Sequence, residues 1–290
     1  MNPRPLVSIL LPVYNEEASL PGDLDATKKA MDASAYSYEL LVIDDGSNDR
    51  SAEIAASRGA RVVRHETKRG YGSAIRTGIG EAAGEIIVIM DADGTYPTSE
   101  IPRLLERLER HDLVVGARRG EEGSARFLRG PAKWFIRTLA CFLTGAEIPD
   151  LNSGMRAFRK EIVDRYLKLL PPGFSCSATL TLIFLCEGYK VAYLPIDYYP
   201  RVGRSKFHPI RDTANFIALV WRMIFYFNPM RILGPLGLSL IVLSLGKATY
   251  DVIAYRFHIA TSTVLIFSLA VQVLVIGLMA DLIIKRSRPH

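Results

Sequence analysis

Two aspartates that flank one small residue are the clearest candidates for chemistry in this sequence. Asp91 and Asp93 follow directly on the apolar run 86–90. Side chains near a strand end diverge, so such a pair can turn toward one point. Hard cations such as Mg²⁺ bind a few carboxylate oxygens and complete their shell with phosphate oxygens and water. Because the sequence has no His/Cys cluster for a softer metal, the pair predicts a metal site at a phosphate-bearing ligand.

Three further polar clusters each follow a short apolar or β-branched run, at 12–17, 44–47 and 68–72. One such cluster alone could be a turn with a helix cap, but four at successive strand ends indicate one ligand crevice. The Gly70-Tyr71-Gly72 turn allows backbone to approach a ligand closely. No G-K-[ST] follows it, and no G-x-G-x-x-G follows the first run. These absences disfavour a P-loop protein or a hydride-transfer enzyme and favour a metal-bridged nucleoside diphosphate.

The elements that must position these clusters alternate between strand and helix patterns. This order is typical of an α/β domain with a mostly parallel sheet and helices on both faces. Ligands of such sheets bind at the carboxyl ends of the strands. Strands are predicted at Val7–Leu11, Glu39–Ile43, Arg61–Arg64, Glu85–Met90, Leu113–Val115 and Val191–Pro195, and helices at Ser19–Asp32, Asp49–Ser57, Ser73–Ala82 and Ser99–Glu109.

The net charge of +6 is unevenly placed along the 290 residues. Residues 1–200 hold 25 basic and 27 acidic side chains, whereas residues 201–290 hold 11 basic and 3 acidic. Because the basic excess lies beside long apolar runs, it indicates a membrane surface and not nucleic acid. The 49% hydrophobic content excludes a disordered chain. Three scattered cysteines exclude a disulfide scaffold and favour a reduced, cytoplasm-facing protein.

Two apolar runs near the end of the sequence are candidate membrane spans. Between Arg231 and Lys247 lie 15 residues without a formal charge, and between Arg256 and Asp281 lie 24. A bilayer core needs roughly 20 apolar residues in a helix. The second run supplies these alone, and the first does so if Lys247 snorkels and pairs with Asp251 one turn away. A pair of buried core helices is the alternative.

Basic residues at the ends of these runs predict their orientation. Three precede the first run, namely Arg211, Arg222 and Arg231, and three follow the second, namely Lys285, Arg286 and Arg288, whereas the connection between the runs offers only Lys247 and Arg256. The positive-inside rule then places both chain ends and the large N-terminal domain in the cytoplasm. The aromatic-rich segment Thr213–Phe227 suits a helix lying in the membrane interface, and a helix docked on the globular domain is its alternative.

The ordered motifs resemble those of a known enzyme family. VSILLPVYNEE, VIDDGSNDRS, KRGYGSAIRTGI and IMDADGTYP look like an inverting glycosyltransferase of family 2 with a GT-A fold. The later segments VVGARR, DLNSGMRAFRK and RVGRSK, followed by a membrane hairpin, resemble the dolichyl-phosphate mannose synthase group of polyprenyl-phosphate glycosyltransferases. The likeness covers roughly residues 6–210 and is specific because the motifs are ordered and spaced. No Q-x-x-R-W motif occurs, which argues against polymer synthesis.

The resemblance implies roles for residues on the donor side. The nucleoside would be held by Pro12, Tyr14, Glu16, Asp44 and Asp45, and the donor would lie against Gly70 and Gly72. Asp91 and Asp93 would hold Mg²⁺ or Mn²⁺ at the diphosphate. Thr95 stands where the group often has a metal-binding Gln, and we expect Thr95 to act through water.

The acceptor side needs cations more than a base. A lipid phosphate carries ~1.5 to 2 negative charges near pH 7, as a phosphorylated side chain does, so its oxygen attacks the sugar without a strong general base. A cluster of basic groups must instead bind it beside the similarly charged donor. The candidates are Arg118, Arg129, Lys133, Arg201, Arg204, Ser205 and Lys206, of which Arg118, Arg129 and Lys206 correspond best to the group's phosphate contacts.

Asp150 stands where many family 2 enzymes have a catalytic acidic residue. With a phosphate acceptor, we expect Asp150 to bind a donor hydroxyl or to orient the acceptor; a turn or helix cap is the structural alternative. With a glycan or protein acceptor, Asp150 would be a true base. A non-catalytic membrane adaptor that senses a nucleotide sugar is the other alternative. The five histidines show no clustering, and we expect them to be structural.

The sequence thus predicts an inverting, metal-dependent hexosyltransferase. It would move mannose from a GDP-linked donor or glucose from a UDP-linked donor to polyprenyl or dolichyl phosphate at the cytoplasmic membrane face. The expected division is a catalytic domain at 1–209, an amphipathic interface helix at 210–230 and a transmembrane hairpin at 231–290, with spans at about 231–254 and 259–284 and a basic tail. Nucleic acid is not expected as a partner, and homo-oligomerisation is left open.

Overall fold

The chain forms two compact units, Met1–Ile217 and Ala218–His290, which are considered separately. The structure is a computed structural model. It describes residues 6–119, 138, 140–141, 144–173, 175–200, 226–227, 229–254 and 259–287.

The first unit is built on a seven-stranded sheet with the order β3-β2-β1-β4-β6-β5-β7. The pairs β1–β2, β2–β3, β1–β4 and β5–β7 are parallel, and β6 runs antiparallel between β4 and β5. The mostly parallel sheet confirms the predicted fold class; the one strand that the sequence did not predict is β6. The strands are β1 Val7–Val13, β2 Tyr38–Asp44, β3 Arg61–Arg64, β4 Ile86–Ile89, β5 Leu113–Arg118, β6 Arg156–Arg159 and β7 Val191–Ile196.

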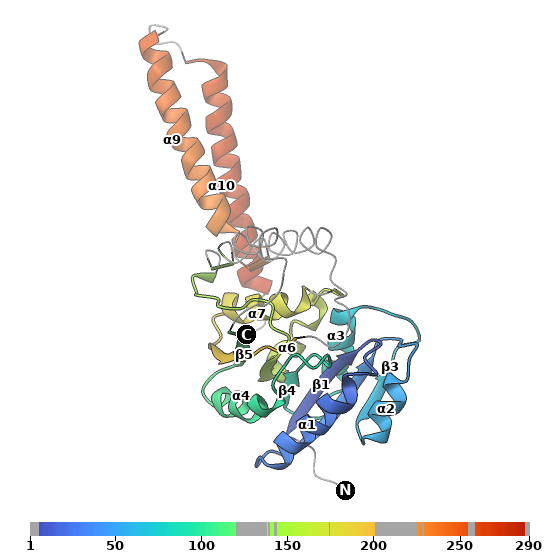
Figure 1. The fold of residues 1–290 in the computed structure, drawn as a ribbon. Helices are drawn as coiled ribbons and strands as arrows, with labels where there is room; N and C mark the ends of the chain where they lie inside the picture. Colours follow the sequence, from blue (N-terminus) through green and yellow to red (C-terminus); the bar gives the residue numbers. More distant parts are fainter. Residues whose placement is uncertain are drawn as a thin grey trace. The chain divides into compact units, whose positions relative to one another are not determined.

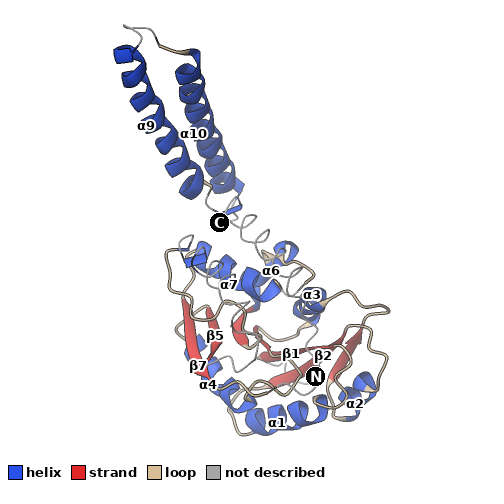
Figure 2. Ribbon diagram, turned by 45° about the horizontal axis from the view of Figure 1, so that its top comes forward, coloured by secondary structure: helices blue, strands red, loops and turns tan. Residues whose placement is uncertain are grey.

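Helices cover both faces of this sheet, with α1, α2 and α4 on one face and α3, α6 and α7 on the other (Figure 2). The apolar stripe of α4 shows why, because Ile101, Leu104, Leu105 and Leu108 recur at helical spacing and are all buried. The helices are α1 Leu20–Asp32, α2 Ser51–Ser57, α3 Tyr71–Glu81, α4 Ile101–Leu108, α6 Lys160–Asp164 and α7 Cys176–Cys186, with short 3₁₀ turns η1 Thr98–Glu100 and η2 Leu167–Leu169.

The register of the central strands brings the polar clusters to one edge. Val13 at the end of β1 lies opposite Asp44 at the end of β2, which in turn lies opposite Arg64 at the end of β3. Leu10 of β1 lies opposite Ile89, the last residue of β4. Both faces of β1 and β4 are buried, as their continuous apolar runs predict. The loops after these four strands therefore begin side by side.

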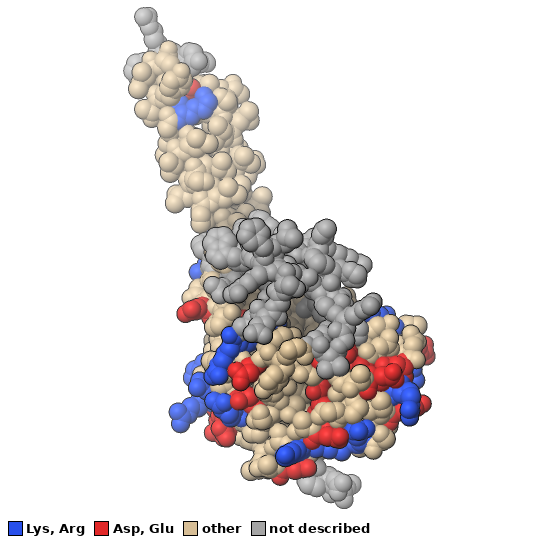
Figure 3. All heavy atoms as spheres, viewed as in Figure 1, with Lys and Arg blue, Asp and Glu red and all other residues tan. Residues whose placement is uncertain are grey.

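The second unit is an antiparallel hairpin of α9 Met230–Ala254 and α10 Thr261–Ser287 (Figure 1). Both helices are long and apolar enough to cross a membrane. A side chain at Gly277 would meet Met230 and Leu233, so glycine allows the two helices to pack closely. Large apolar side chains point outward along both helices, and Figure 3 shows few charges on this unit. The exposed apolar surface is typical of contact with lipid.

A buried carboxylate joins the two helices at their connection. Lys247 Nζ lies 2.9 Å from Asp251 Oδ1, as the one-turn spacing predicts. Asp251 also accepts hydrogen bonds from Ala260 N at 3.1 Å and from the Thr263 hydroxyl. Asp251 therefore caps the start of α10 as well as pairing within α9. The predicted interface helix at 210–230 lies almost entirely outside the described residues, and the proposed domain boundaries stay a prediction.

Candidate active site

Asp93 lies in the turn that follows β4, where Thr95 holds its carboxylate. Its side chain is 6% exposed, and its Oδ1 accepts hydrogen bonds from Thr95 Oγ1 at 2.5 Å and Thr95 N at 3.2 Å. Thr95 is fully buried. The observed contact makes Thr95 a partner that orients Asp93. Its predicted role as a metal ligand stays a prediction.

Asp91 is held from the opposite side of the turn. Its Oδ1 accepts a hydrogen bond of 2.8 Å from the hydroxyl of Tyr71, the first residue of α3. Gly154 packs against the same carboxylate, where any Cβ would collide with it. Burial, and then the charge of Asp91, raise the pKa of Tyr71 well above its usual value. Tyr71 therefore stays protonated and remains a donor to Asp91.

A third carboxylate beside this turn was not predicted from the sequence. Asp23 of α1 accepts a hydrogen bond of 2.9 Å from Gly94 N. The pKa of Asp23 is raised to about 6: burial is the largest cause, the bond from Gly94 partly offsets it, and the charges of Asp93, Glu16 and Asp91 add to the rise. A signal existed in the sequence, because Asp23 lies on the apolar stripe of α1, three residues after Leu20. A bound cation would reduce the repulsion between these neighbouring carboxylates.

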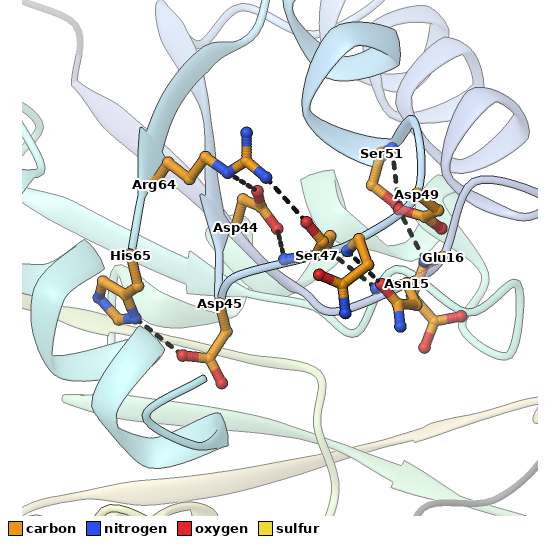
Figure 4. A network of polar contacts seen from close by, with 10 residues as sticks. Asn15, Glu16, Asp44, Asp45, Ser47, Asp49, Ser51, Arg64 and His65 are labelled. Carbon is orange, nitrogen blue, oxygen red and sulfur yellow. Dashed lines mark hydrogen bonds and ion pairs between the residues drawn. The ribbon is translucent and has the colours of Figure 1, made fainter. Parts of the chain in front are cut away.

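Asp44 joins the loops that follow β1, β2 and β3. It is fully buried and lies 3.0 Å from Arg64 Nε, and its Oδ1 accepts a 2.9 Å hydrogen bond from Ser47 N (Figure 4). Ser47 Oγ in turn accepts a 2.9 Å hydrogen bond from Asn15 N. The carboxylate thus fixes the loop that carries Asn15 and Glu16, so it shapes the predicted nucleoside site through its neighbours.

Asp45 is equally buried and binds the segment before α3. Its Oδ1 lies 2.8 Å from both His65 Nδ1 and Arg69 N, and its Oδ2 accepts a 2.8 Å hydrogen bond from Gly70 N. Only 3% of Asp45 is exposed. Direct contact of Asp44 and Asp45 with the nucleoside stays a prediction, while both are seen here organising the loops of the site.

The glycines at 70 and 72 meet another segment of the chain. Gly72 N donates a 2.9 Å hydrogen bond to Pro172 O. A Cβ at Gly72 would collide with the Pro171 carbonyl oxygen and lie 2.9 Å from Cys176 Cβ. Gly70 has φ +99°, a conformation that favours glycine. Close backbone packing therefore explains both glycines, and their predicted contact with the donor is untested.

The remaining donor-side residues lie beside these loops. Pro12 lies in β1 opposite Ile43 of β2. The ring of Tyr14 carries Lys68 Nζ 3.8 Å from its centroid, a cation–π contact. Glu16 donates its backbone N–H to Ser51 Oγ at 3.0 Å (Figure 4). The structure thus places Pro12, Tyr14 and Glu16 at the same strand-end edge as the aspartates.

Arg118 and Asp150 form a bidentate ion pair. Arg118 Nε lies 2.7 Å from Asp150 Oδ2, and Nη2 lies 2.9 Å from Oδ1. Burial alone would raise the pKa of Asp150, but the hydrogen bonds and charge of Arg118 outweigh burial and hold the pKa below its usual range. Asp150 is therefore ionised and paired with Arg118, and this pairing makes it a weaker general base.

The other predicted phosphate-binding residues lie outside the described part of the chain. These are Arg129, Lys133, Arg201, Arg204, Ser205 and Lys206. Among the described residues no group of three or more His, Cys, Asp or Glu side chains could enclose a metal ion. The described carboxylates at 91 and 93 suit a cation that completes its shell with phosphate and water.

Arg156 is a buried cation that sequence reasoning missed. Its side chain is fully buried in β6, and its guanidinium donates to the carbonyls of Ser177 and Ser153. Arg156 lies opposite Ile89 at the end of β4, so it lies close to the turn that carries Asp91. A strand that begins with a fully buried arginine breaks the pattern by which strands are predicted.

Comparison with known proteins identifies the family. Residues 8–167 match the family described as glycosyl transferase family 2. The chain belongs to glycosyl transferase family 2. Residues 228–285 match the GtrB C-terminal hairpin, which covers α9 and all but the last two residues of α10. The expected resemblance to polyprenyl-phosphate glycosyltransferases of this family is confirmed.

Two bacterial relatives carry the same functional name. The undecaprenyl-phosphate 4-deoxy-4-formamido-L-arabinose transferase of Pseudomonas fluorescens (strain SBW25) is 33% identical over 263 residues, which cover 84% of this chain and 72% of the relative. The protein of the same name from Pseudomonas aeruginosa (strain LESB58) is 34% identical over 249 residues, with coverage of 82% and 70%. Both names specify a pentose-derived sugar, whereas the motifs had led us to expect a hexose.

Solved structures confirm the GT-A fold of the family 2 domain. Glucosyl-3-phosphoglycerate synthase from Mycobacterium tuberculosis, in complex with Mn²⁺, UDP and phosphoglyceric acid, superposes with a TM-score of 0.60 at 24% identity, covering 76% of this chain and 78% of the other. Its complex with Mg²⁺ and UDP gives a TM-score of 0.60 at 23% identity, covering 76% and 79%.

Proposed function

We propose that this family 2 glycosyltransferase moves a sugar from a UDP-linked donor to a polyprenyl phosphate at a membrane surface. The observation that carries the proposal is the presence, in one chain, of a two-carboxylate strand-end site and an apolar hairpin of the GtrB type. The names of the relatives support the lipid acceptor. The UDP bound in the structural neighbours supports UDP over GDP. The sugar is a pentose or hexose that a donor screen must identify.

Asp91 and Asp93 are the residues that would hold a divalent cation, Mg²⁺ or Mn²⁺. Tyr71 and Thr95 orient the two carboxylates, and their negative charges add to burial in raising the pKa of the nearby Asp23. A bound cation would supply positive charge against the leaving diphosphate. The preorganised carboxylates keep this site in place before the donor arrives.

The acceptor phosphate is itself the nucleophile. One of its anionic oxygens attacks the anomeric carbon, and the bond from that carbon to the diphosphate oxygen breaks. The products are UDP and a lipid-linked sugar phosphate with inverted anomeric configuration. No proton needs to be removed from the nucleophile, which agrees with an Asp150 that is paired with Arg118 and has a lowered pKa. We assign Arg118 to the acceptor phosphate and Asp150 to orienting Arg118.

The hairpin would anchor this chemistry to the bilayer that contains the acceptor. Its outward apolar side chains fit lipid, and the basic residues at 231 and 285–288 fit the cytoplasmic surface. We therefore propose an integral membrane protein with its catalytic domain and both termini in the cytoplasm.

A transfer assay in membranes tests this function. Membranes that contain the protein are incubated with radiolabelled UDP-sugars, undecaprenyl phosphate and Mg²⁺ or Mn²⁺, and the organic-phase label is counted. We expect at least one donor to label the lipid, and we expect Asp93→Asn to abolish labelling while Glu53→Gln, on the exposed face of α2, leaves it unchanged. Absence of lipid label with every donor would overturn the acceptor assignment.

A further inference from the structure

A buried histidine links three elements of the donor site. His65, which follows β3, is 4% exposed, and its Nδ1 lies 2.8 Å from Asp45 Oδ1 (Figure 4). Its Nε2 lies 2.9 Å from Thr77 Oγ1. Asp45 Oδ1 also accepts the Arg69 amide hydrogen, so we assign the imidazole hydrogen to Nδ1, from which it is donated to Asp45. The imidazole therefore bridges the end of β2 to the middle of α3.

Asp45, which His65 contacts, also binds the backbone just before α3. The same carboxylate that binds His65 accepts hydrogen bonds from the consecutive amides of Arg69 and Gly70, both at 2.8 Å. Gly70 immediately precedes Tyr71, the first residue of α3. Three short hydrogen bonds to one buried carboxylate fix the backbone at 69–70 more tightly than the two amides alone would.

The first residue of α3, Tyr71, contacts a carboxylate in the turn after β4. The hydroxyl of Tyr71 donates to Asp91 at 2.8 Å, so the position of Tyr71 affects one of the two carboxylates assigned to the cation. Thr77, the second partner of His65, lies on the same helix. A continuous set of contacts thus runs from Thr77 and His65 through Asp45 and the 69–71 segment to Asp91.

We propose that His65 is a positioning residue of the donor site. By holding Asp45, it places the 69–71 segment and the Tyr71–Asp91 contact together, and so it tunes binding of the nucleoside diphosphate and of the divalent cation. The inference rests on the proposed function, and it changes the expectation that the histidines are only structural. A histidine that merely filled space would affect the amount of folded protein and would leave the affinity of that protein for its donor unchanged.

Two substitutions separate the two hydrogen bonds of His65. His65→Asn places its amide nitrogen near the position of Nδ1 and retains the bond to Asp45. His65→Gln extends toward the position of Nε2, so it retains the bond to Thr77 and loses the one to Asp45. We expect His65→Gln to raise the KM for UDP-sugar and the half-saturating Mn²⁺ concentration together, each by about tenfold, with kcat changed by less than about threefold. We expect His65→Asn to stay within about threefold of the wild type in both.

A matched histidine elsewhere provides the control. His111 Nδ1 lies 2.9 Å from Arg107 O, and this residue precedes β5, at the end of the strand opposite to the site. His111→Gln should leave both constants unchanged. Thr77→Val, which removes the second partner without loss of volume, serves as the further variant if His65→Gln does not fold. We expect it to raise both constants by about threefold.

Binding of UDP with Mn²⁺, measured by calorimetry on the full chain in detergent, separates this inference from the proposed function. UDP binding that is about tenfold weaker in His65→Gln, and about threefold weaker in His65→Asn, which like Thr77→Val loses only the bond between His65 and Thr77, would support the positioning role even if no lipid were labelled. Equal UDP affinity in folded His65→Gln and wild type would overturn the role. So would equal weakening in the Asn and Gln variants, because it would indicate packing alone. If His65→Gln does not fold, unchanged UDP affinity in Thr77→Val would overturn it.

Discussion

At the scale of residues, the two aspartates of the site are held by different partners and should respond differently to mutation. Asp93 depends on the Thr95 hydroxyl and Asp91 on the Tyr71 hydroxyl. Both partners donate a hydroxyl hydrogen to the carboxylate, so each fixes the direction in which that carboxylate points. The geometry therefore keeps two neighbouring carboxylates ready for a cation even though Asp23 adds a third close by.

Thr95→Val should weaken the proposed cation site without unfolding the protein. The change keeps volume but removes the hydroxyl that holds Asp93, a hydrogen bond worth about 1–3 kcal/mol when its acceptor is charged. We expect the half-saturating Mn²⁺ concentration for sugar transfer to rise about tenfold, and Thr95→Ser to remain close to the wild type. An unchanged Mn²⁺ dependence in Thr95→Val would show that Thr95 does not orient a cation ligand.

Asp23 predicts a pH dependence of stability. Its pKa is raised to about 6 in the folded protein from an ordinary value of 3.8, so the folded state holds this proton more tightly than the unfolded state. The contribution of Asp23 to the free energy of unfolding therefore falls as the pH rises from about 4 to about 6. Without metal at pH 7.5, we expect Asp23→Asn to be more stable than the wild type by on the order of 1 to 3 kcal/mol.

Thermal unfolding in EDTA at several pH values measures this effect. The difference in Tm between Asp23→Asn and the wild type should be small near pH 4 and should grow toward pH 7. A difference that stayed constant with pH would contradict the raised pKa, because it would have to arise from an interaction that does not titrate.

Asp150→Asn distinguishes an orienting residue from a base. Loss of the charge that holds Arg118 should lower kcat/KM for the lipid phosphate by about 10- to 100-fold, the range expected for one charge-assisted hydrogen bond. The pH–rate profile should keep its shape, since the proposed nucleophile needs no deprotonation by Asp150. Disappearance of an acid-side limb from the profile of the variant would instead assign Asp150 as the base.

At the scale of elements, the sequence predicted those strands and helices whose periodicity is visible. The strands β1 to β5 and β7 and the helices α1 to α4 follow the predicted ranges closely. Helix α7 was missed because it is buried almost all round, and a helix without a polar face gives no amphipathic signal. Strand β6 was missed because it begins with the buried Arg156 and ends with Arg159.

In the candidate site too, some residues could be predicted from the sequence and others could not. Asp91 and Asp93 were predictable because their spacing follows an apolar strand. The partners of Asp45 were not, since His65 and Gly70 are 20 and 25 residues away and meet it only through the register of β2 and β3. The role of Gly72 was also hidden, because the segment it packs against lies about a hundred residues further along the chain.

Two glycines on α3 allow this packing to be tested. Gly72→Ala would collide with the Pro171 carbonyl and with Cys176, whereas a Cβ at Gly80 meets nothing within 4 Å. We expect Gly72→Ala to lower the free energy of unfolding by roughly 1–3 kcal/mol. Gly80→Ala should raise it by about 0.5–1 kcal/mol through helix propensity. Thermal unfolding of the two variants measures this, and equal Tm values would contradict the close approach of 171–173.

At the scale of the whole molecule, charge and hydropathy divide the chain into parts with different surroundings. The first 200 residues are slightly acidic with mixed surface charge, and the remaining 90 are strongly basic around an apolar hairpin. Figure 3 shows the same contrast, with both signs of charge on the described atoms of the first unit and few on the hairpin. A lipid phosphate suits both properties of the last 90 residues, because its phosphate is attracted to basic side chains and its chain lies in the bilayer.

The proposed orientation predicts which positions in the hairpin a reagent can reach from outside the cell. In intact cells, a membrane-impermeant thiol reagent should label His258→Cys, in the connection between the spans, and should not label His290→Cys until the membrane is opened. The native cysteines at 141, 176 and 186 lie in the first unit and should stay unlabelled in intact cells. Labelling of His290→Cys from outside would reverse the proposed orientation.

The chemical structure of the product tests the central claim most directly. Purified protein is incubated in vesicles with undecaprenyl phosphate, Mn²⁺ and the UDP-sugar that labels lipid, and the product is examined by mass spectrometry and NMR. The account predicts a single sugar joined through one phosphate to the lipid, with anomeric configuration opposite to that of the donor. Release of free sugar without a lipid product, a sugar joined to lipid through two phosphates, or retention of configuration would contradict it.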